Sequence, residues 1–263
     1  EETQTKIKVS FSYQNKKTDV LAVDNANNPF RDENGKLLFR PGGHGALIEN
    51  LYGLDGDVIF IKNIDNVIQN HKEINALYKK ALAGLMVTLQ NQIFSYLQVL
   101  EDGQSVKIEE MIDFAKTNLN VKISDEVNKY TLENQIAHLK NILNRPIRVC
   151  GMVKNEGDAG GGPFWVRDSN GVVSLQIVET SQIDLNNAEQ ANIFSDSTHF
   201  NPVDLVCGIL NYKGEKFYLP DFVDDNSGFI VQKNQNGKPL KSYELPGLWN
   251  GAMAKWITIF VEV

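Results

Sequence analysis

Phe39-Arg-Pro-Gly-Gly-His-Gly-Ala-Leu47 is a loop with three glycines, and with the segment that follows it, this loop decides the expected fold. Glycine has no Cβ, so the loop can adopt positive φ and let a ligand approach its backbone N–H groups. Ala46 to Leu51 then predicts a short helix, whose first amides would point toward such a ligand. The loop therefore indicates a binding site for a charged or flat ligand.

Asp57-Val-Ile-Phe-Ile-Lys-Asn-Ile-Asp-Asn66 comes next and supplies a strand. Asp57 to Ile61 is a continuous apolar run, which is typical of a parallel strand buried on both faces. Asn63, Asp65 and Asn66 follow at its carboxyl end, where open α/β sheets bind ligands. A purely structural interpretation stays open, in which the glycines form a tight turn and Asp65 caps the next helix. The order and spacing of the two motifs favour the ligand site.

Four further motifs follow downstream. They are Arg148-Val-Cys-Gly-Met-Val-Lys-Asn155, Gly160-Gly-Gly-Pro-Phe-Trp-Val166, Val178-Glu-Thr-Ser-Gln-Ile183 and His199-Phe-Asn-Pro-Val-Asp-Leu205. Together with the glycine loop and the strand before them, these motifs follow one another in the order found in UDP-sugar pyrophosphorylases, and the chain resembles that family. It most closely resembles an uncharacterised bacterial family, a domain of unknown function that is distantly similar to those enzymes. Nearly the whole chain resembles the carboxyl-terminal part of that family.

The resemblance implies an α/β fold, a GT-A-like (Rossmann-type) nucleotidyltransferase with a mixed sheet flanked by helices and a helical insertion. Residues 1–70 would be the nucleotide-binding half of the sheet, 71–145 the helical insertion and 146–263 the sugar-binding half. The family's opening loop, which ends in Thr-Arg or Ser-Arg and wraps the triphosphate, has no counterpart here. We therefore expect a fragment whose triphosphate half lies upstream, and which alone binds poorly and catalyses nothing.

The resemblance also assigns roles to individual residues. The nucleotide-binding residues would be Gly42, Gly43, His44, Gly45, Asn63 and Asp65, and the sugar-binding residues would be Gly161, Gly162, Glu179 and Asn201. Asp65 would also bind the metal, which the resemblance implies to be Mg²⁺, and Lys154 would contact a phosphate as the catalytic residue. Lys238 or Lys241 lies where relatives place another phosphate-binding lysine, and the sequence does not choose between them.

Some of these assignments have a structural alternative, and others rest on the chemistry of the side chain. Lys154 could instead be a solvated lysine at the end of a strand. Glu179 interrupts an apolar strand, so it either points to solvent or accepts hydrogen bonds from sugar hydroxyls, because a buried unpaired charge is costly. Asn201 offers both a donor and an acceptor. His44 could stack on a base or bond to it.

The implied reaction joins a nucleoside triphosphate, taken as UTP, to a sugar 1-phosphate with release of pyrophosphate. One alternative is a catalytically silent sugar-nucleotide-binding or regulatory protein. A second is a GT-A glycosyltransferase, in which Asp65 would hold a metal on the diphosphate of a finished nucleotide-sugar.

Composition narrows the class of protein. With 263 residues, of which 42% are hydrophobic, the chain can bury a substantial core. It has no apolar stretch of the roughly 20 residues that a membrane span needs, and we expect a cytoplasmic protein. A net charge of −7 argues against nucleic-acid binding, so local cations must hold a phosphorylated ligand. Cys150 and Cys207 lie in apolar runs and predict buried reduced thiols.

The spacing of apolar residues in the rest of the chain predicts further strands and helices. Lys6 to Tyr13 alternates with period two and predicts a half-buried strand. Glu73 to about Leu100 predicts a long helix, whose expected core residues are Leu77, Ala81, Leu82, Leu85, Leu89, Ile93, Phe94 and Leu97. Two more helices are expected at Ser105 to Leu119 and Thr131 to Leu143, each N-capped by its first residue. Strands are expected at 146–150, 164–166, 172–178 and 205–207.

Overall fold

A four-stranded mixed sheet is the centre of the computed structural model, which describes residues 5–67, 70–102, 107–157, 161–167 and 171–263. Its strands in spatial order are β10 (Ile257–Glu262), β4 (Ile147–Lys154), β7 (His199–Gly208) and β3 (Ile59–Lys62). β10 pairs with β4 in parallel, and β7 runs antiparallel to both β4 and β3. β3, β4 and β10 therefore end at one edge of the sheet, which we call the carboxyl edge.

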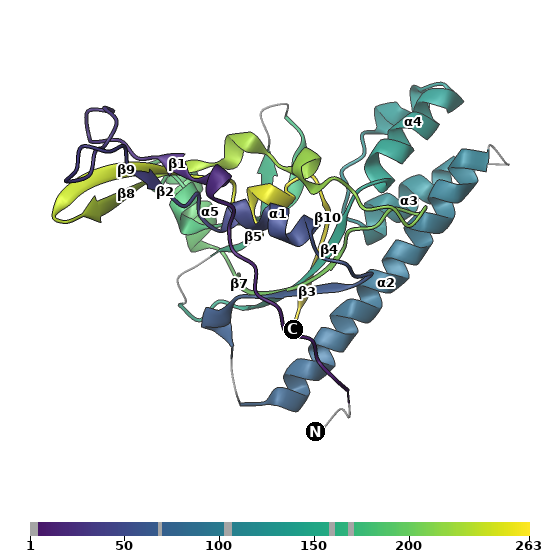
Figure 1. The fold of residues 1–263 in the computed structure, drawn as a ribbon. Helices are drawn as coiled ribbons and strands as arrows, with labels where there is room; N and C mark the ends of the chain where they lie inside the picture. The colour runs from purple at the N-terminus through teal and green to yellow at the C-terminus, as the bar shows by residue number, and fades with distance from the viewer. Residues whose placement is uncertain (1–4, 68–69, 103–106, 158–160, 168–170) are drawn as a thin grey trace.

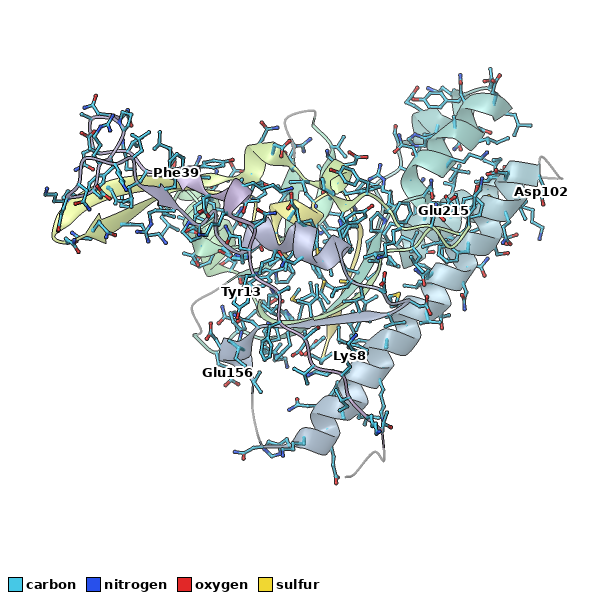
Figure 2. All side chains as sticks on the ribbon, in the orientation of Figure 1. Lys8, Tyr13, Phe39, Asp102, Glu156 and Glu215 are labelled. Carbon is cyan, nitrogen blue, oxygen red and sulfur yellow. The ribbon has the colours of Figure 1, made fainter. Side chains whose placement is uncertain are left out.

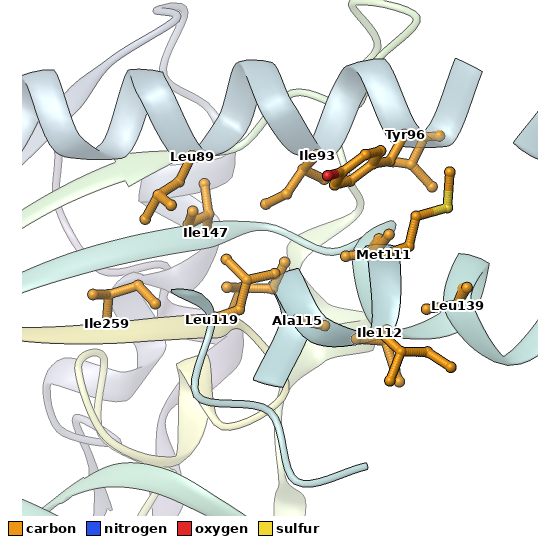
Figure 3. Close-up of a cluster of buried hydrophobic side chains, with 14 of the residues drawn as sticks. Leu89, Ile93, Tyr96, Met111, Ile112, Ala115, Leu119, Leu139, Ile147 and Ile259 are labelled. Carbon is orange, nitrogen blue, oxygen red and sulfur yellow. The ribbon is translucent and has the colours of Figure 1, made fainter. Parts of the chain in front are cut away.

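Three helices cover one face of this sheet (Figure 1). They are α2 (Lys72–Asp102), α3 (Ile108–Asn118) and α4 (Leu132–Leu143). Leu89 and Ile93 of α2 pack in one buried cluster with Ile147 of β4 and Ile259 of β10 (Figure 3). Strands from the first 70 residues and from the last third of the chain thus share one sheet. The predicted fold class, a mixed α/β sheet flanked by helices, is confirmed.

The prediction for α2 is correct in extent and partly wrong in its buried face. Leu82, Leu89, Ile93 and Leu97 are buried and Phe94 is half-buried. Leu77, Ala81 and Leu85 are exposed. No residue of α2 before Leu82 is buried, so the first turns of the helix extend past the core. Helical spacing alone gives the direction of a face but not how far the sheet beneath it reaches.

A second core lies on the other face of the sheet. It joins Ile59 of β3, Leu205 of β7 and Ile48 of α1 (Ile48–Tyr52) to the segment around Met253. The predicted buried, unpaired cysteines are confirmed. Burial raises the pKa of the Cys150 thiol to about 11 and also raises that of Cys207, so both remain protonated and inert.

Two hairpins flank the sheet. β5 (Gly162–Arg167) pairs with β6 (Val173–Val178), and α5 (Ala188–Ser195) follows them. β8 (Phe229–Gln235) pairs with β9 (Lys238–Glu244) in an arm that projects from the body beside β1 (Val20–Leu21) and β2 (Phe39–Arg40) (Figure 1).

Two helix-capping residues were predicted, and the one that lies among the described residues is confirmed. Thr131 Oγ1 accepts a hydrogen bond from the Asn134 N–H and caps α4, as predicted. Ser105, the other predicted cap, lies outside the described residues.

The predicted strand at Lys6 to Tyr13 is wrong. Its four apolar side chains, Ile7, Val9, Phe11 and Tyr13, are between 72% and 85% exposed. Figure 2 labels Lys8 and Tyr13 on this segment. Alternation favours a strand only when a neighbouring strand accepts its hydrogen bonds, and within the described part of the chain this segment pairs with none.

None of the helices in the described residues is long and apolar enough to cross a membrane.

Candidate functional site

Two lysines converge on one carboxylate at the carboxyl edge. Lys62, the last residue of β3, places Nζ 2.6 Å from Oδ2 of Asp204 and 3.1 Å from the Pro202 carbonyl oxygen. Lys79 of α2 lies 3.7 Å from the other oxygen, Oδ1, which is buried and has no hydrogen-bond partner among the described residues. An ammonium group has three donors, so Lys62 retains one N–H for a ligand.

A strained turn presents this group. Val203 is buried and has a φ of 57°, which is a genuine outlier for a β-branched residue. Asn201 holds the turn, because its Oδ1 accepts the Val203 N–H at 3.0 Å. Such a conformation costs on the order of 1–3 kcal/mol and persists only where the surrounding structure holds it in place. Here it brings the Pro202 carbonyl and the Asp204 carboxylate to Lys62.

A second polar group lies farther along the same edge. Lys154 ends β4 opposite His199 of β7, and both approach the carboxylate of Glu262 at the end of β10, at 3.9 Å and 3.6 Å. The Lys154 side chain is 76% exposed. The edge therefore carries cations on two of its strands, and the outer one, Lys154, is accessible to solvent.

Asn63 and Asp65 follow β3 directly. Asn63 Oδ1 accepts the Asp65 N–H at 3.4 Å and caps the 3-10 helix Ile64–Asn66. The structural role foreseen for Asp65 thus belongs to Asn63. The Asp65 carboxylate is exposed and has no hydrogen-bond or ion-pair partner in the described chain. Asn66 joins this turn to the strained one, because its Nδ2 donates to the Pro202 carbonyl at 3.2 Å.

The carboxylates do not form a complete metal cage. Among the described residues, no three carboxylate, imidazole or thiol groups lie together, and Asp204 already faces two lysines. Mg²⁺ characteristically takes one or two protein carboxylates and completes its shell with water and substrate phosphates. Asp65 alone fits that pattern as a single ligand.

His44 belongs to a separate cluster with Glu179 and Trp249. Its Nδ1 accepts the Leu248 N–H at 2.9 Å, so Nε2 carries the proton and faces Glu179 Oε1 at 3.4 Å. Its ring stacks on Trp249 with 4.1 Å between centroids and 16° between planes. Both nitrogens of His44 are therefore bonded within the protein.

Glu179 is held as a carboxylate in this cluster. Its hydrogen bond with His44 is the largest cause of a lowered pKa, and burial opposes the shift. The Glu179 N–H also donates to Gln182 Oε1 at 3.0 Å. The sequence left open a carboxylate that points to solvent or one that accepts sugar hydroxyls, and the structure shows a third arrangement, in which the carboxylate faces His44.

This lowered pKa predicts an acid-sensitive contribution to stability. Because the folded-state pKa lies below the ordinary value of 4.5, the contribution is complete above that pH and disappears as the pH falls through the folded-state pKa. Glu179→Gln should flatten the decline in unfolding free energy below pH 4.5, measured by urea denaturation. Exposed Glu156 provides the control. If Glu156→Gln flattens the curve equally, the contact with His44 contributes nothing.

The glycine loop packs against the protein itself. A Cβ at Gly45 would lie 2.0 Å from the Pro246 carbonyl oxygen, and one at Gly42 would lie 2.9 Å from Leu245 Cδ1. Gly43 has a φ of 83° and begins the 3-10 helix His44–Leu47, which continues into α1. The close approach foreseen at Gly42 and Gly45 is thus made by the segment 245–246.

The structure brings most of the predicted residues into one continuous region. The Asn201 N–H donates to the Gly161 carbonyl at 2.8 Å, and a Cβ at Gly161 would lie 3.4 Å from Glu179 Cγ. Gly162 is buried against the His199 carbonyl oxygen. The strained turn therefore connects the His44 cluster with Lys62, Asn66 and the end of β4.

Lys238 and Lys241, the two candidates for a further phosphate-binding lysine, both lie on β9 of the arm. Lys241 Nζ bonds to the Asn25 carbonyl at 3.3 Å and to Asn27 Oδ1 at 2.6 Å. Lys238 begins β9 and borders a small pocket with Arg31 and Gln235. Neither has a described contact with the carboxyl edge.

Sequence reasoning missed several members of the region. Lys62 and Asp204 were visible inside quoted motifs, and a lysine directly after an apolar strand was a usable signal. Lys79 and Trp249 gave no signal, because only the tertiary fold brings α2 and the 245–249 segment to the site.

Comparison with known proteins adds a family and a set of similar structures. A family described as a domain of unknown function (DUF4301) matches residues 1–263, and the chain belongs to that family. No curated protein matches it.

Among solved structures, the chain is similar to UDP-glucose pyrophosphorylase from Leishmania major, at 14% identity and a TM-score of 0.40 over 93% of this chain and 43% of that chain. A variant of the same enzyme in complex with UDP-glucose gives 13% identity and a TM-score of 0.41 over the same shares. The chain thus spans less than half the length of these structures.

Proposed function

We propose that this DUF4301 chain is the sugar-nucleotide half of a nucleotidyltransferase, which joins UTP to a sugar 1-phosphate and releases pyrophosphate. The observation that carries the proposal is the group of Lys62, Lys79 and Lys154 at the carboxyl edge. The chain is acidic overall, and this edge supplies cations where an α/β sheet binds its ligands.

Nucleotidyl transfer needs little covalent help from the protein. It needs both anions held in line and the developing charge neutralised. Lys62 would donate its remaining N–H to the diphosphate, while Asp204 and the Pro202 carbonyl fix its direction. Lys154, which is the last residue of β4 and is exposed, would contact the second phosphate. Its ammonium group is a compact charge on a flexible stem.

The metal has a defined place in the proposal. Asp65 would hold one Mg²⁺ through its exposed carboxylate, and the ion would supply further neutralisation of phosphate charge when bound. Asn63 would keep the backbone of that turn fixed, because it caps the 3-10 helix that carries Asp65.

The glycine loop and the strained turn would position the nucleoside and the sugar. Because His44 bonds to Leu248 and Glu179 through its two nitrogens, it would act by holding Trp249 and Glu179 in place. Gly161, Gly162 and Asn201 would shape the sugar side through their packed backbone. The division into 1–70, 71–145 and 146–263 and a cytoplasmic location are part of this proposal.

Pyrophosphorolysis by the whole protein of which we propose this chain to be one half, called the parent below, tests the reaction. With UDP-glucose or UDP-N-acetylglucosamine, Mg²⁺ and pyrophosphate, we expect UTP and the sugar 1-phosphate. Asp65→Asn should lower the rate at limiting Mg²⁺ more than at saturating Mg²⁺. Sugar transfer or hydrolysis that ignores pyrophosphate would instead identify a glycosyltransferase. Tight nucleotide-sugar binding without turnover would identify a silent binding protein.

A further inference from the structure

A cleft of about 920 Å³ lies between the β5–β6 hairpin, α5 and the segment 223–229. Its volume is in the range of sites for small molecules. Gly161, Gly162, Glu179 and Asn201 are not among the described residues that line it. Lys62, Lys79 and Lys154 do not line it either, so the cleft is separate from the carboxyl edge.

One wall is a single face of the hairpin. Phe164 and Gln176 are cross-strand partners in the β5–β6 register, so their side chains share that face. Gln176 is only 8% exposed, and its Nε2 donates to Ser174 Oγ at 2.9 Å and to the Ala254 carbonyl at 2.8 Å. These bonds fix the amide and leave its Oε1 as an acceptor with no partner in the described chain.

The facing wall comes from α5 and the start of β8. Phe194 and Phe229 provide two more aromatic rings. Gln190 Oε1 accepts the Asp184 N–H at 2.9 Å, and no described residue accepts from its Nε2. The cleft thus combines apolar rings with one fixed acceptor and a pair of donors, which suits a ligand with both C–H faces and hydroxyl groups.

The charges of the lining select against an anion. Arg167 and Lys255 are its cations, whereas Glu189, Asp224 and Asp225 contribute three carboxylates. A phosphate or carboxylate ligand would meet more negative than positive charge, while a neutral ligand would meet no such penalty.

We propose that this cleft binds a neutral sugar, whose ring packs against Phe164, Phe194 and Phe229 and whose hydroxyls bond to Gln176 and Gln190. The site would be a second carbohydrate site, and it does not depend on the reaction proposed for the carboxyl edge.

NMR titration of the chain with methyl β-glucoside and maltose tests this site, with glucose 1-phosphate as the charged probe. We expect the neutral sugars to shift the side-chain amide signals of Gln176 and Gln190 saturably. Glucose 1-phosphate should shift these signals at least about fivefold more weakly. Any shifts that it causes at the carboxyl edge should be reduced by Lys62→Met, which keeps the two sites distinguishable.

Two variants make the test specific. Phe194→Ala should weaken sugar binding about tenfold, the size expected for one lost ring contact, and α5 has no buried residue whose packing it would disturb. Gln190→Glu keeps an acceptor for the Asp184 N–H but removes the donors, and it should also weaken binding. Phe11→Ala, at an exposed ring outside the cleft, should change nothing. The proposal is overturned by any of three results: neutral sugars leave the cleft signals unmoved, glucose 1-phosphate binds in the cleft as tightly as the neutral sugars, or Phe194→Ala binds these sugars as tightly as the unsubstituted chain.

Discussion

Gly45→Ala is expected to destabilise the protein by about 3 kcal/mol or more, a large part of the stability of a typical domain. The new Cβ would lie 2.0 Å from the Pro246 carbonyl oxygen and 2.7 Å from its carbonyl carbon. Both atoms belong to the backbone, so no side chain can rotate away. The loop and the 245–249 segment would have to separate, and His44 would lose its contacts with Leu248 and Trp249.

Urea denaturation measures this effect against a control of opposite sign. Gly84 lies in the middle of α2, and nothing lies within 4 Å of a Cβ placed there. Gly84→Ala should therefore stabilise the chain by about 1 kcal/mol, the helix-propensity difference. If Gly45→Ala unfolds at the same urea concentration as the unchanged protein, the packing described for the glycine loop is wrong.

Lys62→Met is expected to lower the unfolding free energy by about 2 kcal/mol and to weaken nucleotide binding about 10- to 100-fold. The first effect arises because Lys62 and Asp204 are only 23% and 21% exposed, and Asp204 would be left facing Lys79 at 3.7 Å. The second follows from the loss of a charge-assisted hydrogen bond to phosphate, which contributes about 1.5–3 kcal/mol. Methionine keeps the apolar stem and removes the charge.

A double-mutant cycle separates the two roles of Lys62. Asp204→Asn removes the counter-charge and should reduce the cost of Lys62→Met to stability, because no carboxylate is then left unpaired. The loss of nucleotide binding should persist in that background. Lys129→Met removes a lysine paired with Glu126 on the helical side and should leave nucleotide binding unchanged. Equal nucleotide affinity in Lys62→Met and Lys129→Met would exclude Lys62 from the site.

The sequence predicted where helices and strands form better than it predicted which strands pair with each other. The apolar run from Asp57 to Ile61 and the helical spacing from Glu73 to about Leu100 are local signals, and a strand and a helix form there. The expectation of a parallel strand buried on both faces is wrong, because in the described chain β3 pairs only with antiparallel β7 and Phe60 is 53% exposed. The pairing that places Lys62 opposite Asp204 joins residues 142 positions apart. Such a register depends on which strands become neighbours, which a local pattern does not contain.

The glycine loop shows the same limit in the candidate site. Gly42 and Gly45 correctly indicated a close approach to the backbone, but the sequence could not tell a ligand from Pro246, which is distant in the chain. The segment Lys6 to Tyr13 failed for the reverse reason. Its alternation is that of a strand, and no neighbour in the described chain pairs with it.

The central claim is that the carboxyl edge holds the diphosphate of a nucleotide-sugar. Calorimetric titration of UDP-glucose into this chain and into the proposed longer parent protein, with and without Mg²⁺, tests it most directly. We predict saturable, Mg²⁺-strengthened binding by the parent, weaker or no binding by the chain alone, and loss of the parent's affinity in Lys62→Met. Absence of heat from both folded proteins, or unchanged affinity in Lys62→Met, would contradict the claim.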